Sequence, residues 1–158
     1  MSSHQSARSM KTEWLTPPWL IDKIGLLDLD PCAPVNRPWD TAKEHYTILD
    51  NGLTKEWHGL VWCNPPYDEA GLWLKRLADH GNGIALIFAR TETKMFFDYV
   101  WERATAVFFI KNRLFFHHVT GERAKSNGGA PSVLVAYGND AVRIIRNSGL
   151  EGKLLEIK

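Results

Sequence analysis

An abrupt change of character marks the stretch Val61-Trp62-Cys63-Asn64-Pro65-Pro66-Tyr67. The apolar run from Leu60 to Cys63 predicts a buried strand. Two successive prolines cannot continue a strand or donate backbone hydrogen bonds, so the chain must turn sharply after Asn64. The turn therefore places one amide and one aromatic ring, that of Tyr67, at the carboxyl end of a strand. Open α/β sheets bind their ligands at this end of their strands.

Length and composition restrict the class of protein around this turn. The 158 residues suffice for one domain with a full core, and 44% apolar with 23% charged residues is typical of soluble globular chains. The N-terminus lacks the apolar segment of a signal peptide and no apolar run reaches membrane-spanning length, so we expect a cytoplasmic protein. Cys32 and Cys63 suit a reducing compartment, and without clustered Cys and His residues a metal site is not expected. The net charge of +1 means that any DNA-binding surface must be local.

The order of elements predicts one α/β domain over residues 13–158, preceded by a flexible N-terminus over residues 1–12. Strands are expected over 26–30, 44–49, 60–63, 84–89, 106–110 and 131–137, with helices over 17–24, 68–80 and 94–104. Thr16 is expected to cap the first helix and Asp68 the second. The residues after 140 are expected to add one or two short edge elements. Strands that alternate with helices predict a three-layer sandwich with a mainly parallel sheet, ending in antiparallel C-terminal strands.

Two further positions carry open alternatives. Asp30 ends its predicted strand just before a turn, so its carboxylate can meet an amino group of a bound cofactor or cap its own turn. Thr16-Pro17-Pro18, taken alone, is more simply the start of a helix.

The Asn-Pro-Pro-Tyr turn suits one kind of chemistry. The side-chain oxygen of Asn64 and the carbonyl of Pro65 can accept both hydrogens of a planar NH₂ group, which makes its nitrogen nucleophilic. The ring of Tyr67 can stack on a flat substrate. With a methyl group on a sulfonium as electrophile, the reaction is a direct in-line transfer that depends on positioning and needs no metal or covalent intermediate. The simpler alternative is a proline-rich turn with a packed tyrosine.

Five segments in this order carry a resemblance: Glu13-Trp14-Leu15-Thr16-Pro17, Leu29-Asp30-Pro31-Cys32-Ala33, Asn51-Gly52-Leu53, Asn64-Pro65-Pro66-Tyr67 and Asn112-Arg113-Leu114-Phe115-Phe116. Together they resemble the compact phage-type, Dam-like DNA N6-adenine methyltransferases, over roughly residues 13–138.

The resemblance implies a Rossmann-like fold, S-adenosylmethionine as methyl donor, and a flipped or single-stranded DNA adenine as acceptor. It implies catalytic roles for Asn64, Pro65, Pro66 and Tyr67. It assigns the cofactor to Thr16, Pro17, Asp30, Pro31, Cys32, Ala33, Asp50 and Asn51, with the choice between Asp50 and Asn51 left open. A phage or prophage origin, a bacterial host cytoplasm and a place in DNA methylation or restriction-modification also follow from it.

The sequence departs from the wider pattern of such enzymes. Cys32-Ala33-Pro34 replaces a glycine-rich first loop, and no separate target-recognition domain is visible. DNA readout is therefore expected from the loops over 90–94 and 111–127, through Arg90, Lys94, Lys111, Arg113, His117, Arg123 and Lys125. For any one of these residues a solvated surface position is the simpler interpretation. Arg113 is the strongest candidate because it lies in the matching segment.

Two alternatives remain open at this point. One is a methyltransferase that acts on another amino group, on an RNA base or a protein glutamine. The other is a non-enzymatic DNA-binding protein that has kept the fold, against which the intact Asn64, Pro65 and Tyr67 argue.

Overall fold

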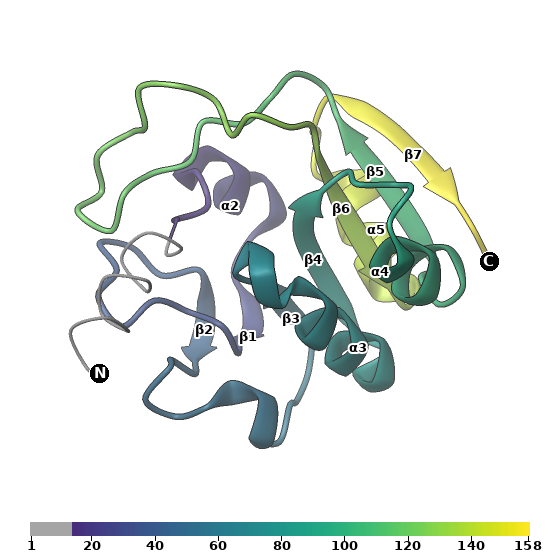
Figure 1. Ribbon diagram of the computed structural model, residues 1–158, viewed down its shortest axis with the longest axis horizontal. Helices are drawn as coiled ribbons and strands as arrows, with labels where there is room; N and C mark the ends of the chain where they lie inside the picture. Colours follow the sequence, from purple (N-terminus) through teal and green to yellow (C-terminus); the bar gives the residue numbers. More distant parts are fainter. Residues whose placement is uncertain (1–13) are drawn as a thin grey trace.

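A computed structural model describes residues 14–158, which surround one seven-stranded sheet (Figure 1). The predicted flexible segment over 1–12 lies outside the described residues. The strands are β1 (Leu27–Asp30), β2 (Ala42–His45), β3 (Val61–Cys63), β4 (Gly83–Phe88), β5 (Ala106–Ile110), β6 (Ser132–Tyr137) and β7 (Gly152–Glu156). The helices are α2 (Pro18–Ile24), α3 (Ala70–His80), α4 (Lys94–Phe96) and α5 (Asn139–Asn147), with short turns η1 (Gly52–Thr54), η2 (Tyr67–Glu69) and η3 (Phe97–Trp101).

The sheet is half parallel and half antiparallel. Its order is β2-β1-β3-β4-β6-β5-β7. The pairings β1–β2, β1–β3 and β3–β4 are parallel, whereas β4–β6, β5–β6 and β5–β7 are antiparallel. The prediction of a mainly parallel sheet was therefore wrong, because only half of the strand pairings are parallel. Strand β6 inserts between β4 and β5, and β7 adds an antiparallel strand at the edge of the sheet. The antiparallel C-terminal strands themselves are confirmed.

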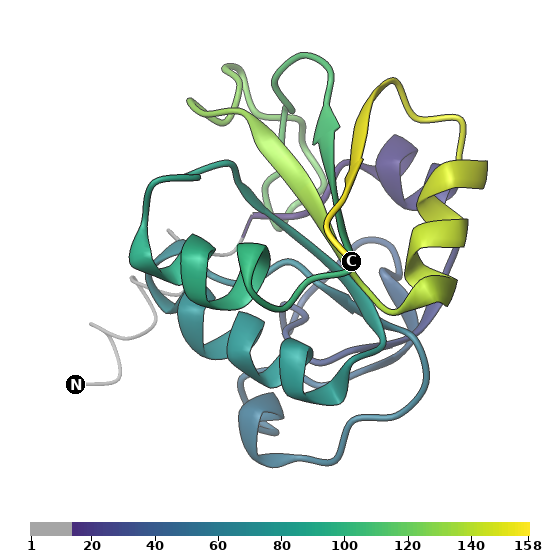
Figure 2. The same cartoon turned by 90° about the vertical axis from the view of Figure 1, so that its right-hand side faces the viewer.

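Two hydrophobic clusters, one on each face of the sheet, confirm the predicted three layers. Residues of α2 and α5 pack with Trp62, Ile84 and Leu134 on one face. Residues of α3, α4 and η3 pack with Val61 and Ala85 on the other face. Figure 2 shows α5 and the pair α3–α4 on opposite sides of the strands. Because helices cover both faces, β6 is buried at every position and β4 at all but its last.

Several predicted boundaries differ from the observed ones. Strand β2 begins two residues earlier than expected. The helix expected over 94–104 is only one short α-turn, α4, that continues as the π-helical turn η3. Helix α3 begins at Ala70 with Glu69 at its N-cap, because Asp68 belongs to the preceding turn η2. At the C-terminus β7 is the expected edge strand, but α5 packs against a sheet face.

The segments that the sequence analysis singles out lie at the carboxyl ends of the parallel strands. Strands β1, β3 and β4 run parallel, so their carboxyl ends, at Asp30, Cys63 and Phe88, lie on the same side. The long loop over 111–131 joins the carboxyl end of β5 to the amino end of β6, which lies opposite Phe88. The loop is therefore at the same end of the sheet as Asp30 and Cys63. The chain passes from β1 to β2 on one side and then to β3 on the other, so the strand order reverses between β1 and β3. Such a reversal is where open α/β sheets form their ligand crevice.

Candidate active site

The Asn-Pro-Pro-Tyr turn stands at the carboxyl end of β3, as predicted. Asn64 is half-buried and Pro65 is buried, directly after the fully buried β3. Pro66 adopts φ −56° and ψ 139°, which prevents the strand from passing straight into a helix. Tyr67 then begins η2 with 60% of its surface exposed. A tyrosine left this exposed beside a buried turn is available to contact a ligand.

Asn64 is held by a residue far away in the sequence. Its Nδ2 donates a hydrogen bond of 3.1 Å to Oγ1 of Thr16, and Thr16 is only 2% exposed. The expected role of Thr16 as helix cap was wrong, because α2 begins at Pro18 and its N-cap is Pro17, without a side-chain cap. The hydroxyl of Thr16 binds the amide of Asn64 instead.

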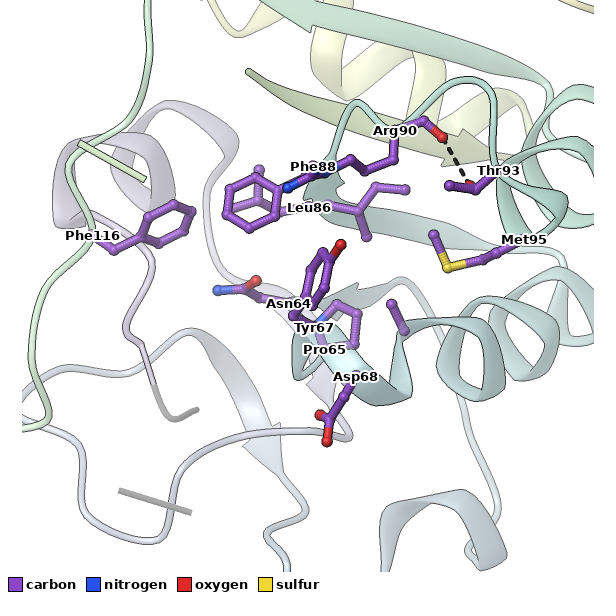
Figure 3. A pocket seen from close by; sticks show the side chains of 12 residues that line it. Asn64, Pro65, Tyr67, Asp68, Leu86, Phe88, Arg90, Thr93, Met95 and Phe116 are labelled. Atoms are coloured by element: carbon purple, nitrogen blue, oxygen red, sulfur yellow. Dashed lines mark hydrogen bonds between the residues drawn. The ribbon is translucent and has the colours of Figure 1, made fainter. Parts of the chain in front are cut away.

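A cavity of about 340 Å³ opens beside this turn. Figure 3 shows Asn64, Tyr67, Phe88 and Phe116 around this space. The ring of Tyr67 lies 5.8 Å from that of Phe88, and the ring of Phe88 lies 6.2 Å from that of Phe116. The guanidinium of Arg90 stands 5.6 Å from the centre of the Tyr67 ring. The wall is thus mainly apolar, with three aromatic rings among its residues, and suits a flat, apolar-faced ligand whose edge reaches Asn64.

A second cavity, of about 620 Å³, adjoins the first and shares Asn64, Pro65 and Tyr67 with it. Its outer wall comes from Trp14 and from the loop over 118–128, including Arg123 and Lys125. The guanidinium of Arg123 is stacked 4.0 Å from the centre of the Phe115 ring. These two predicted DNA-binding cations therefore line the second cavity, and Arg90 lines the first.

Other predicted DNA contacts lie apart from the two cavities. Lys94 forms an ion pair with Asp98 on the same helical face, and Lys111 pairs with Glu151 at 3.5 Å. Both lysines are exposed, so these pairs are weak and salt-sensitive. Arg113 is exposed and lines neither cavity. A direct role in the pocket is not available to these three residues, although each remains accessible to a phosphate.

His117 joins two parts of the chain. Its backbone N–H donates to the carbonyl of Leu15 at 3.0 Å, and its carbonyl accepts from the N–H of Leu15 at 2.8 Å. Its Nδ1 lies 3.0 Å from the carbonyl of Gly121, and its ring meets the Trp39 ring edge-on. These contacts give His117 a structural part, tying the segment before Thr16 to the loop over 111–131.

Asp30 is buried, and both of its carboxylate oxygens accept hydrogen bonds from nearby residues. Its Oδ1 accepts from the backbone N–H of Cys32 at 3.0 Å, and its Oδ2 accepts from the hydroxyl of Thr41. Burial raises the pKa of the Asp30 carboxyl from 3.8 to about 6, although these hydrogen bonds and the charge of Arg37 act in the opposite direction. Of the two roles open from the sequence, the turn cap is present in the structure.

The raised pKa of Asp30 predicts a pH-dependent stability. Because the pKa is higher in the folded than in the unfolded chain, the native state binds more protons between these values. We expect the wild-type protein to lose stability relative to Asp30→Asn as the pH rises from about 4 to about 6. An asparagine can keep both hydrogen bonds but cannot ionise. Urea unfolding of both proteins at several pH values measures the difference, and a constant difference would contradict the prediction.

The two predicted cofactor segments lie against each other. A Cβ on Gly52 would stand 2.0 Å from the carbonyl oxygen of Pro31, so only glycine allows this contact. The preceding Asn51 takes the left-handed conformation, at φ 56°. Asp50 accepts from the backbone N–H of Thr47 at 2.8 Å and so caps its own turn. Asp50 and Asn51 are both exposed beside the β1 turn, and the choice between them stays open.

Sequence reasoning missed the aromatic walls of the pocket. Phe88 was read only as part of a buried strand, and Phe116 only as part of a matching segment. The available signal was position, since Phe88 ends the strand that follows β3 in the sheet. In the segment over 112–116, Asn112 has a structural role, because it takes φ 66° and turns the chain after β5.

Residues 14–158 contain neither a grouped set of metal ligands nor a membrane-spanning helix. Within this range no three His, Cys, Asp or Glu side chains are grouped so that they could hold a metal ion. None of the helices in the same range is long and apolar enough to cross a membrane.

Comparison with known proteins identifies the family. No curated protein and no solved structure matches the chain. A family model does match, over residues 3–147, and its description is DNA N-6-adenine-methyltransferase (Dam). The match spans the turn at Asn64, both predicted cofactor segments, and the loop that carries Phe116. On this evidence the chain belongs to the Dam family of DNA N-6-adenine-methyltransferases.

Proposed function

We propose that this protein transfers a methyl group from S-adenosylmethionine to the N6 amino group of adenine in DNA, at a specific site. The observation that carries the proposal is the cavity at the Asn64–Tyr67 turn, into whose lining three aromatic rings are built, in a chain of this family. Adenine is flat and carries one exocyclic NH₂ group, which matches an aromatic wall with amide and carbonyl acceptors at one end.

Each residue of the turn has a separate role toward the acceptor base. Oδ1 of Asn64 and the carbonyl of Pro65 accept the two N6 hydrogens, which localises the lone pair on the nitrogen. Tyr67 stacks on one face of the base, with Phe88 and Phe116 closing the pocket around it. When bound, S-adenosylmethionine supplies an electrophilic methyl group on its sulfonium. The N6 nitrogen forms a bond to that methyl carbon as the carbon–sulfur bond breaks, and the extra N6 proton is released toward the acceptors and water.

The cofactor region proposed here is the switch point between β1 and β3. The close approach of the Gly52 backbone to the carbonyl oxygen of Pro31, which a Cβ at residue 52 would prevent, supports it because it holds the two segments together at this point. Thr16, Asp50, Asn51 and the turn after Asp30 are the residues that would hold the donor there. The parallel order β2-β1-β3-β4 around this point supports a Rossmann-like methyltransferase fold.

DNA is proposed to approach from the side of the loop over 111–131. Arg123 and Lys125, which line the second cavity, and Arg90, which lines the first, are suited to bind phosphates. A base inside a duplex cannot enter such a cavity while it is stacked, so the target adenine must be flipped out or single-stranded.

Methyl transfer from labelled S-adenosylmethionine tests the function. We expect the label to appear in unmethylated DNA, at N6 of adenine after hydrolysis to nucleosides, and not in RNA or in a mixture of proteins. Sequencing the methylated positions then gives the recognition site. Incorporation into RNA or protein alone would favour the alternative acceptors, and saturable cofactor binding without any transfer would favour a non-enzymatic DNA-binding protein.

A further inference from the structure

The side-chain amide of Asn64 has one hydrogen-bond partner among residues 14–158, the hydroxyl of Thr16. Its Nδ2 donates to Oγ1 of Thr16 at 3.1 Å, and no other hydrogen bond of the Asn64 side chain is present among residues 14–158. An asparagine amide is planar, with its donor and its acceptor on opposite sides. When Nδ2 faces Thr16, Oδ1 is turned toward the remaining side, where the cavity lies.

Thr16 is itself held firmly in place. It is 2% exposed, between the buried Leu15 and the buried Pro17. Leu15 exchanges two backbone hydrogen bonds with His117, at 2.8 and 3.0 Å. Pro17 restricts the backbone of Thr16 and is the N-cap of α2, whose residues Leu20, Ile21 and Ile24 lie in the core. The backbone of Thr16 is therefore held in place by the core on one side and by the bridge between Leu15 and His117 on the other.

We propose that Thr16 is a positioning residue that orients Asn64 for the acceptor amino group, an inference that rests on the proposed function and deepens it. The resemblance assigns Thr16 only to the cofactor. Acceptance from Asn64 uses a lone pair of the hydroxyl and leaves its hydrogen for another acceptor, so both roles can coexist. The reverse amide orientation would point Nδ2 at the substrate NH₂ group and set donor against donor.

This role predicts a specific kinetic result for Thr16→Val. Valine matches threonine in shape but removes the hydroxyl, so Asn64 loses the partner that orients its amide. We expect kcat, measured at saturating cofactor and DNA, to fall about tenfold. Thr16→Ser restores the hydroxyl and is expected to keep kcat within about twofold of the wild-type value, as rescue by a conservative variant.

Thr105→Val is the matched control. The hydroxyl of Thr105 also accepts one hydrogen bond, from the N–H of Gly138 at 2.9 Å, but it lies at the opposite edge of the sheet from Asn64. Its loss is expected to lower stability without changing kcat. Thermal unfolding of all variants separates a loss of folded protein from a loss of chemistry.

The kinetic readout also separates the inference from a purely cofactor-binding role. Cofactor affinity is measured by calorimetry, independently of transfer. An unchanged kcat for Thr16→Val at saturating cofactor would overturn the inference, even if cofactor affinity fell. A lowered kcat supports it whether or not affinity changes.

A second measurement keeps the inference distinct from the proposed function. The side-chain NH₂ group of Asn64 gives a pair of nitrogen–proton NMR signals, which the Asn64→Asp variant identifies by their disappearance. We expect Thr16→Val to shift this pair and speed its exchange with water, and Thr16→Ser to restore it. If the wild-type protein transfers no methyl group, the proposed function fails, but this readout still decides: an unshifted pair in Thr16→Val would overturn the positioning role.

Discussion

Replacement of Asn64 by alanine is expected to abolish methyl transfer while leaving cofactor binding within about twofold of wild type. The variant removes the oxygen that accepts an N6 hydrogen, and the loss of one such group from a preorganised site costs about 100- to 1000-fold in rate. Asn64 is half-buried and belongs to neither hydrophobic cluster, so truncation leaves the core intact. Single-turnover transfer measures the chemistry and calorimetry measures cofactor binding.

Asn64→Asp is the matched control for this prediction. A carboxylate keeps the accepting oxygens, and the hydroxyl of Thr16 can donate to it instead of accepting. We expect this variant to retain a measurable part of the transfer activity that Asn64→Ala loses. Activity of Asn64→Ala equal to that of the wild-type protein would refute the role of Asn64.

Gly52→Ala is expected to weaken both the fold and the cofactor site. The added Cβ would meet the carbonyl oxygen of Pro31 at 2.0 Å and the ring of Trp73 at 3.3 Å. The nearer neighbour is backbone, which cannot rotate away, so η1 and the β1 turn must separate. Such forced insertion costs about 1–3 kcal/mol. Since the two displaced segments are those proposed to hold the cofactor, we expect its affinity to fall at least about tenfold, or about 1.4 kcal/mol.

Gly71→Ala provides the control for the added methyl group. Gly71 lies inside α3, and a Cβ there would meet only the side chain of Met95, at an ordinary distance of 3.7 Å. Because alanine favours the helix over glycine by up to about 1 kcal/mol, this variant is expected to be as stable as the wild-type protein or more so. Denaturant unfolding and cofactor titration compare the two variants. Normal stability and affinity in Gly52→Ala would contradict the proposed cofactor region.

The strands were predictable where a continuous apolar run marked them. Strand β5 begins and ends where its apolar run predicts, and β1, β3, β4 and β6 lie within one residue of their predicted bounds. The helix expected over 94–104 was harder, since its α-helical turn gives way to a π-helical one at Phe97 without any sign in the apolar pattern. The insertion of β6 between β4 and β5 leaves no local signature at all, because only pairing across the sheet decides strand order.

The sequence by itself determined the sharp turn after β3, because two prolines exclude a continuing strand whatever surrounds them. It also determined that an amide and an aromatic ring follow a buried strand, and its ordered segments indicated the family. Only the tertiary structure decided that Thr16 binds Asn64 rather than capping α2, and that Phe88 and Phe116 face the same space as Tyr67. The hydrogen bond between Thr16 and Asn64 joins residues 48 positions apart, and such partners are set by packing of the whole sheet rather than by any local preference.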